Sequence, residues 1–346
     1  MSQCRIVLDT PGVLGAGSTL YGKILCTFTA DTIIREIRCR IRGKENTSIR
    51  QGKHTYVGRN TFLNLTQTLV GEGTVPIGRY EFRFSFTLPT DIPSSFSGKY
   101  GSIYYYIKAT VDVPLMFNYK DKICLRVMVP VNFNSMREEL QLTPVVYENE
   151  KTLCCWCCAS EPITLSLFVE KEAFTLGEIA NILVEIVNMS NTNVEEFELS
   201  LVRVTEYLSE KNGTNHVTIK ERVAVEKATG VGAHGRRIYR IDFQIPQTID
   251  LYNFANCYLI KQQFMLMAEA ALPGVHQNFS VFASIMLGHI PLLETHGFQQ
   301  ARSGIEVFGR NLQESESPPR YSSLNLYDIE ENDTLADSTI SDIENS

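Results

Sequence analysis

Four cysteines lie within a run of five residues, and they could bind metal, carry lipid or pack. Cys154, Cys155, Cys157 and Cys158 flank Trp156, the only tryptophan. Zinc needs thiolates that converge tetrahedrally, and two adjacent pairs separated by one residue converge poorly. Palmitoylation of such a cluster would tether the chain to a membrane. We favour a structural interpretation, in which reduced cysteines pack at a domain junction as small hydrophobic side chains.

A short proline-rich motif near the C-terminal end could bind a protein module. Pro318, Pro319 and Tyr321 form a PPxY sequence around Arg320. Prolines favour the extended left-handed conformation, so little entropy is lost when the motif docks in the aromatic groove of a WW domain, with the tyrosine in the neighbouring pocket. The flanking sequence is serine-rich and acidic with few large apolar residues, which predicts disorder. We therefore predict WW-domain binding.

Arginines alternate along one predicted strand. Between residues 37 and 42, apolar residues alternate with Arg38, Arg40 and Arg42, so the three guanidinium groups share one face. Arginine forms paired hydrogen bonds to phosphate and carboxylate, which suits a ligand that is acidic or phosphorylated. The pattern alone is equally compatible with a solvated sheet face. Further cations lie close in sequence: Arg35, Lys44, Arg50 and Lys53.

The remaining motifs do not indicate catalysis. Residues 230–235 read GVGAHG, a literal GxGxxG, but a dinucleotide site needs a helix after it, and the sequence that follows predicts a strand. We therefore expect a mobile hairpin loop that binds no cofactor. The histidines show no metal-ligand pairing, and no nucleophile elbow or phosphate loop is present in the sequence. We expect a protein that is not an enzyme, with no cofactor and no metal.

The elements that must position these residues are predicted to be β-strands. Apolar and polar residues alternate with a period of two in runs such as 80–88, 103–113, 163–169 and 182–186. Clusters of Gly, Pro, Asn and Ser separate the runs at intervals that suit a β-sandwich. No long amphipathic helical pattern is found, so the predicted class is all-β.

Two parts of the chain read alike. Residues 78–89 and 235–246 both begin with Gly-Arg, alternate apolar with polar residues and end at proline, and each precedes a second alternating run that ends at Pro114 or Pro273. The offsets are 157 (246 − 89) and 159 (273 − 114), and their near equality indicates a duplicated unit. We predict two tandem immunoglobulin-like domains, residues 1–147 and 161–295, joined by a cysteine-rich linker, 148–160, and followed by an acidic tail, 296–346.

Charge is unevenly distributed. Residues 1–150 hold 18 Lys and Arg against 13 Asp and Glu, a net +5, whereas residues 151–346 hold 14 against 26, a net −12, giving −7 in total. The first half therefore suits an anionic partner, but the imbalance is too small to indicate nucleic-acid binding. No apolar run reaches the length of a membrane span, and the first residues lack a signal-peptide core. We expect a cytoplasmic protein with reduced thiols.

Several ordered segments resemble the α-arrestin (arrestin domain-containing) family, over roughly residues 6–293. The resemblance implies two arrestin β-sandwiches and an adaptor that binds cytosolic regions of membrane receptors or transporters. It also implies recruitment of a HECT-type ubiquitin ligase through the PPxY motif, with endocytosis and endosomal sorting of the cargo. The segments are LDTP (8–11), GSTLYGK (17–23), LP (88–89), PSSFSGKYGSIYY (93–105), KTLCCWCC (151–158), FTLGE (174–178), PG (273–274) and GHIPL (288–292).

The family implies recruitment from the cytoplasm to the plasma membrane and endosomes, with peripheral membrane association if the cysteine cluster is lipidated. Two features depart from the family pattern. Many members have Pro-Trp where this chain has Pro114-Leu115, and the loop 229–235 lacks the cysteine through which one member binds thioredoxin. Two alternatives stay open: a retromer-like trafficking scaffold, for which a PPxY motif has no use, and a signalling arrestin for phosphorylated receptors.

Overall fold

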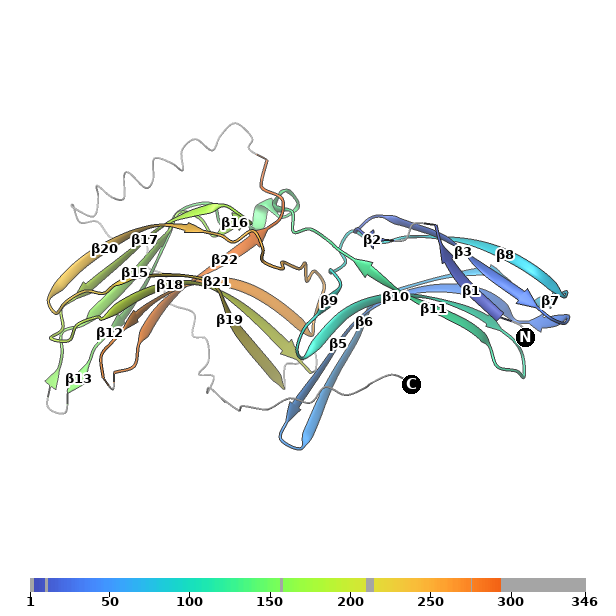
Figure 1. Ribbon diagram of the computed structural model, residues 1–346, viewed down its shortest axis with the longest axis horizontal. Coiled ribbons are helices and arrows are strands. Elements are labelled where there is room, and N and C mark those ends of the chain that lie inside the picture. Colours follow the sequence, from blue (N-terminus) through green and yellow to red (C-terminus); the bar gives the residue numbers. More distant parts are fainter. Residues whose placement is uncertain (1–2, 10–11, 156–157, 210–214, 275, 294–346) are drawn as a thin grey trace.

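The computed structural model describes residues 3–9, 12–155, 158–209, 215–274 and 276–293 (Figure 1). The described chain is built from strands, with two single-turn 3-10 helices, η1 (Phe133–Ser135) and η2 (Arg137–Glu139), between the domains. The prediction of an all-β protein with two tandem β-sandwich domains is confirmed. Within the described residues, no helix is both long enough and apolar enough to span a bilayer.

The N-terminal domain is a sandwich of two mainly antiparallel sheets. One sheet has the order β1-β3-β8, and the other has the order β2-β11-β10-β5-β6, with β9 paired to β10. A small pair, β4 with β7, lies at the end of the domain that is remote from the second domain (Figure 1). The bounds are β1 Gln3–Leu8, β2 Val13–Leu14, β3 Thr19–Phe28, β4 Thr32–Ile34, β5 Glu36–Gln51, β6 His54–Val70, β7 Gly73–Val75, β8 Gly78–Thr87, β9 Phe96–Ser97, β10 Gly101–Asp112 and β11 Tyr119–Val127.

The C-terminal domain repeats this plan. Its sheets have the orders β12-β15-β17-β20 and β16-β22-β21-β18-β19, and a hairpin is formed by β13 and β14. The bounds are β12 Val145–Lys151, β13 Cys154–Cys155, β14 Cys158–Ala159, β15 Ile163–Val169, β16 Ala173–Thr175, β17 Ile179–Asn188, β18 Glu196–Leu208, β19 His216–Thr229, β20 Gly235–Gln244, β21 Ile260–Ala271 and β22 Phe279–Gly288.

The repeated sequence runs form equivalent strands of the two domains. The first repeated run forms β8 and β20, each at one end of its sheet, and the second forms β10 and β21, each in the interior of the opposite sheet. In both domains the short strand that begins the larger sheet, β2 or β16, pairs in parallel with its neighbour, whereas the other pairs are antiparallel. This parallel pairing at the same place in both domains indicates two copies of one fold.

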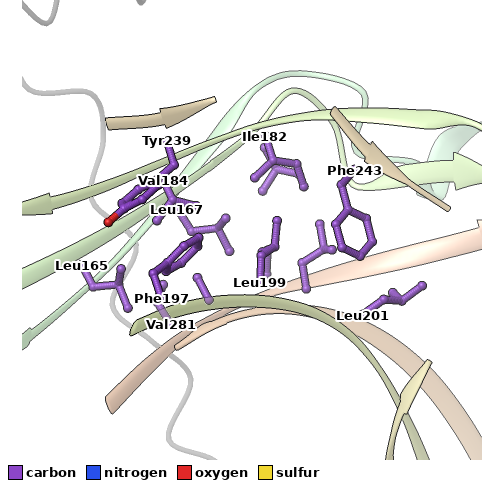
Figure 2. Close-up of a cluster of buried hydrophobic side chains, with 14 of the residues drawn as sticks. Leu165, Leu167, Ile182, Val184, Phe197, Leu199, Leu201, Tyr239, Phe243 and Val281 are labelled. Atoms are coloured by element: carbon purple, nitrogen blue, oxygen red, sulfur yellow. The ribbon is translucent and has the colours of Figure 1, made fainter. Parts of the chain in front are cut away.

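Period-two alternation builds both cores. In β17, Ile182, Val184 and Ile186 point inward and are at most 1% exposed. They face the second sheet. From that sheet, the Phe197 ring of β18 stacks across the core on the Tyr239 ring of β20, with centroids 4.7 Å apart (Figure 2). Because one face of each strand is buried and the other is solvated, a one-residue slip would expose the whole apolar set, and this fixes the register.

The segment predicted as a linker contributes to the second domain. Val145–Lys151 forms β12, which pairs along its whole length with β15, from Val145 opposite Val169 to Lys151 opposite Ile163. The first sheet of the C-terminal domain therefore begins at residue 145. The predicted linker, 148–160, includes the end of this strand and the β13–β14 hairpin, in which Cys155 lies opposite Cys158.

The two domains share a packed interface. Tyr207 and Ile260, from strands of the C-terminal domain, are at most 2% exposed and belong to the N-terminal hydrophobic core. The Tyr207 ring meets Tyr100 edge-on at 5.7 Å, and the Thr47 hydroxyl donates to the Leu208 carbonyl oxygen at 2.6 Å. A second contact is aromatic, since Phe96 packs edge-on against Phe254 at 5.1 Å. Such interlocking fixes the relative position of the sandwiches.

Candidate functional site

The predicted arginine stripe lies on the solvent side of β5. Cys39 and Ile41 are fully buried, and Arg38, Arg40 and Arg42 alternate with them on the opposite side of the strand. The same alternation continues to Lys44, which shares this side. The structure therefore brings the three predicted arginines together on one solvated surface.

Neighbouring strands extend this surface. In the register of the sheet, Lys108 of β10 lies opposite Arg40 of β5 on one side and opposite Lys122 of β11 on the other. Lys120 lies opposite Thr110, and the exposed residues of β11 alternate through Lys122 to Arg126. We call these eight side chains the basic face: Arg38, Arg40, Arg42, Lys44, Lys108, Lys120, Lys122 and Arg126.

Within the described part of the chain, most of the basic face has no neutralising carboxylate. Arg38 is the exception, because its guanidinium group pairs with Glu36 and lies 3.8 Å from Asp112. Arg40 donates to the Thr66 hydroxyl at 2.9 Å, and Arg42 donates to the Asn64 side-chain oxygen at 3.2 Å. Among the described residues, no ion pair is formed by the other seven cations of the face: Arg40, Arg42, Lys44, Lys108, Lys120, Lys122 and Arg126.

The crowded cations perturb one another and a tyrosine among them. The ammonium of Lys122 lies 4.5 Å from the centre of the Tyr106 ring. Burial opposes ionisation of Tyr106, but a hydrogen bond from Arg42 and the charge of Lys44 lower the pKa of its phenol. Partial burial and the nearby charge of Lys120 lower the pKa of Lys108. A bound anion would reduce the repulsion between these cations, so the electrostatics of the basic face favour anion binding.

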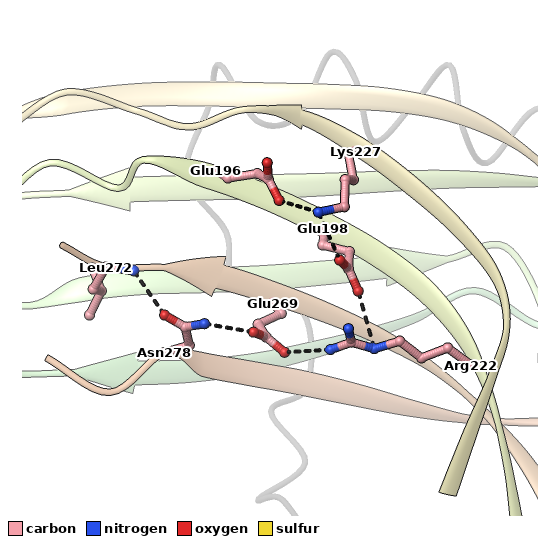
Figure 3. Close-up of polar contacts among 7 residues, drawn as sticks. All are labelled: Glu196, Glu198, Arg222, Lys227, Glu269, Leu272 and Asn278. Carbon is pink, nitrogen blue, oxygen red and sulfur yellow. Dashed lines mark hydrogen bonds and ion pairs between the residues drawn. The ribbon is translucent and has the colours of Figure 1, made fainter. Parts of the chain in front are cut away.

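The equivalent face of the C-terminal domain is neutralised. Arg222 lies 3.3 Å from Glu198 and 3.4 Å from Glu269, and Lys227 lies 2.6 Å from Glu196 (Figure 3). This network runs on through Asn278, which donates to Glu269 at 2.8 Å and accepts from the Leu272 N–H at 3.0 Å (Figure 3). Two copies of one fold thus differ in the charge of the same sheet. The cations of the first domain, which have no carboxylate partner among the residues that the structure describes, are therefore a specific feature of that domain.

The other predicted site residues are those of the PPxY motif and the cysteine cluster. Pro318, Pro319 and Tyr321 lie outside the described residues, as does Cys157. Cys154, Cys155 and Cys158 lie in the β13–β14 hairpin of the C-terminal domain, and their lipidation stays a prediction. In the described part of the chain, no group of three or more His, Cys, Asp and Glu side chains is arranged to hold a metal.

The GxGxxG segment connects two sheets. It joins β19 to β20, which do not pair with each other, whereas we expected a hairpin. At its start the backbone of Gly230 approaches the carbonyl of Val194 so closely that a Cβ atom would overlap it. The neighbouring Val231 exchanges backbone hydrogen bonds with Val194 at 2.8 and 3.0 Å. The first glycine therefore serves close backbone packing.

Sequence reasoning missed half of the basic face. Lys120, Lys122 and Arg126 alternate along one run, a pattern that could have marked them as one side of a strand. Lys108 stands between apolar and small residues on its strand, and its sequence gives no comparable signal. Their position beside Arg40 and Arg42 depends on the pairing of β5, β10 and β11, which joins segments far apart in the sequence.

Comparisons with known proteins agree with this architecture. Residues 4–134 match the family model "Arrestin (or S-antigen), N-terminal domain", and residues 159–292 match "Arrestin (or S-antigen), C-terminal domain". Arrestin domain-containing protein 4 of Homo sapiens is 25% identical over 345 residues, covering 91% of this chain and 79% of that protein. Arrestin domain-containing protein 1 of Mus musculus is 24% identical over 294 residues, covering 84% of this chain and 65% of that protein.

Proposed function

The chain belongs to the arrestin family, in its α-arrestin branch, and from that premise we propose that it links membrane-protein cargo to a WW-domain, HECT-type ubiquitin ligase. The double sandwich holds the cytosolic part of a receptor or transporter, and the PPxY motif holds the ligase. Ubiquitin transfer to the cargo then directs endocytosis and endosomal sorting. The ligase supplies the chemistry, and this chain supplies proximity.

The basic face is the observation that supports the first part of the proposal, the binding of cargo. Seven cations without a carboxylate partner among the described residues stand on a rigid sheet, and the duplicated domain neutralises the same sheet with ion pairs. An acidic or phosphorylated cytosolic segment would supply the missing counter-charges. Arginine and lysine side chains suit this role, because charge-assisted hydrogen bonds to carboxylate or phosphate are stronger than neutral ones.

The ligase half is supported by the sequence of the tail. The described chain ends at Leu293, and 24 residues (318 − 293 − 1) separate it from Pro318. Fully extended, a segment of that length spans at most about 80 Å. A ligase held by the motif therefore stays within reach of cargo that is held by the body. One copy of the motif binds without the avidity that a tandem pair would provide.

The ligase half is tested by measuring the affinity of the whole chain for WW domains of HECT-type ligases. We expect binding at about micromolar strength, the affinity expected of a short peptide motif, and we expect Tyr321→Ala to abolish it. Tyr327→Ala is the matched control, because it removes a tyrosine from the same tail without touching the motif. Equal binding by wild type and Tyr321→Ala would contradict the proposed recruitment.

A negative result would change the preferred function. A double sandwich that binds no WW domain would favour the retromer-like scaffold, in which coat subunits take the place of the ligase. Capture of phosphorylated receptor tails without any ligase would favour the signalling arrestin. Ubiquitination of a cargo protein in cells that express wild type or Tyr321→Ala separates these cases, because only the adaptor depends on that tyrosine.

A further inference from the structure

The loop that joins β10 to β11 presents three consecutive apolar side chains to solvent. Leu115 is fully exposed, Met116 is 66% exposed and Phe117 is 97% exposed. Single exposed apolar residues are normal on protein surfaces, but contiguous ones mark interaction sites. The loop lies at the end of the N-terminal domain remote from the C-terminal domain (Figure 1). We call residues 114–118 the distal loop.

The distal loop is held in a defined shape. Its base is closed by the Asn118 side chain, which accepts a hydrogen bond from the Val113 N–H at 3.0 Å. Below it the two strands pair from Val111 opposite Tyr119. Leu115 has a φ of 58°, in the left-handed region that a branched side chain rarely adopts. Residues held in such sparsely populated backbone regions cluster at functional sites.

Cations and further apolar residues surround the loop. The guanidinium group of Arg35, which is 62% exposed, lies 3.7 Å from Asp112 and lines a shallow hollow with Leu115 and Phe117. The exposed Lys120 follows the loop and begins the β11 part of the basic face. At the same end of the domain, Ile33 of β4 is 61% exposed, and Ile77, which follows β7, is 64% exposed.

This arrangement fits a lipid surface better than a protein partner. Three side chains on a protruding tip offer far less than the roughly 800 Å² per partner that a stable protein interface buries. A bilayer needs no complementary shape, and it accepts apolar side chains below the headgroups while arginine and lysine meet anionic lipid phosphates. The distal loop supplies the apolar side chains for such a contact, and Arg35 and Lys120 beside it supply the cations.

We propose that the distal loop is a membrane contact, in which Leu115, Met116 and Phe117 enter the interface of an anionic bilayer. The cations beside the loop contact the headgroups. This contact would place the adjoining basic face near the bilayer, where cytosolic segments of membrane proteins emerge. It requires neither cargo nor ligase, so it can hold or fail independently of the proposed adaptor function.

The first experiment measures sedimentation of the 346-residue chain, produced without lipidation, with two kinds of vesicle. One is phosphatidylcholine alone, and the other contains phosphatidylserine as well. We expect binding to the anionic vesicles and a loss of about tenfold or more in the Leu115→Ser/Phe117→Ser variant. The matched control is Ile179→Ser/Val57→Ser, which removes apolar side chains that are 51% and 49% exposed elsewhere on the surface.

A second experiment locates the loop in the bilayer. In a Trp156→Phe background, Phe117→Trp places the only tryptophan at the tip, and Ile179→Trp places it far from the tip. We expect the Phe117→Trp emission to shift to the blue and to be quenched by lipids brominated on their acyl chains, with no change for Ile179→Trp. Unchanged thermal unfolding of each variant shows that the fold is intact.

Three results would overturn the proposal. The first is equal sedimentation of wild type and Leu115→Ser/Phe117→Ser, and the second is an unquenched tryptophan at position 117. The third is sedimentation of the wild type with neutral and anionic vesicles alike, which would remove the role of Arg35 and Lys120. Self-association that disappears in the double variant, without vesicle binding, would assign the loop to a second copy of this chain instead.

Discussion

The carboxylate of Glu45, in the N-terminal domain, accepts a hydrogen bond from the backbone N–H of Leu259, in the C-terminal domain, at 3.2 Å. The same carboxylate accepts from the Tyr258 N–H and from the Asn60 side-chain amide, both at 2.8 Å. Glu45 has no exposed surface. A charge removed from water in this way is retained only where hydrogen bonds compensate for its lost hydration. The contact therefore ties the two sandwiches through a single side chain.

Glu45→Gln is expected to destabilise the protein by about 2 kcal/mol. The amide keeps the shape of the side chain, but one oxygen becomes an NH2 group that faces backbone donors, and the charge that strengthened the remaining bonds is removed. Chemical denaturation would give the free energy of unfolding. Glu72→Gln, in an exposed turn, is the control and should have no measurable effect. Equal stability of the two variants would contradict a role for Glu45 in domain association.

Gly98→Ala should loosen the same interface from another side. A Cβ atom at Gly98 would overlap the Tyr207 hydroxyl and approach the Phe96 ring to 2.7 Å. Forcing such atoms apart typically lowers stability by about 1–3 kcal/mol. Hydrogen exchange at the backbone around Tyr207 should accelerate, because the ring must leave the N-terminal core. Gly71→Ala is the matched control, since nothing lies within 4 Å of its added methyl group.

Charge reversal should weaken recognition of anionic segments by the basic face. We expect Arg40→Glu/Arg42→Glu to weaken binding of an acidic or phosphorylated cytosolic peptide by about tenfold or more, because two attractive charges become repulsive ones. The wild-type affinity should also fall with added salt. Arg79→Glu/Arg83→Glu makes the same change in net charge on the opposite sheet of the same domain. Fluorescence anisotropy measures all three proteins, and equally weakened binding in both variants would show that only net charge matters.

Two buried thiols should make the protein less stable in alkali. Burial raises the pKa of Cys26 and Cys39 to about 12, from an ordinary value of 9.0. Above pH 9 the unfolded thiols release protons that the folded thiols retain, so rising pH favours unfolding until the folded pKa is reached. The decrease in stability is at most about 1.4 kcal/mol per pH unit for each thiol.

Denaturant titrations between pH 8 and pH 10 would measure this slope. Cys26→Ala/Cys39→Ala should flatten it, whatever the variant does to stability at neutral pH. Cys124→Ser should leave the slope unchanged, because Cys124 is exposed. A slope that is the same in all three proteins would mean that other groups cause the alkaline destabilisation.

Local information determined the fold class of this protein. Alternation in runs such as Ile182 to Ile186 reports which face of a strand is buried, and neighbouring residues alone set that alternation. The duplicated proline-bounded runs likewise revealed two copies of one domain, because equivalent strands keep equivalent turn residues. The three arginines of β5 were assigned to one face by the same period of two, and in the structure they lie on the same side of the strand.

Only the tertiary structure decided what surrounds those residues. Arg40 and Lys108 are 68 positions apart in the sequence (108 − 40), and they became neighbours because β5 and β10 pair in a particular register. Glu45 and Leu259 met because the two sandwiches dock, and no pattern within either segment specifies that contact. Alternation in the sequence predicts which side of a strand faces the core. Which strand pairs with its edge depends on the packing of the whole chain.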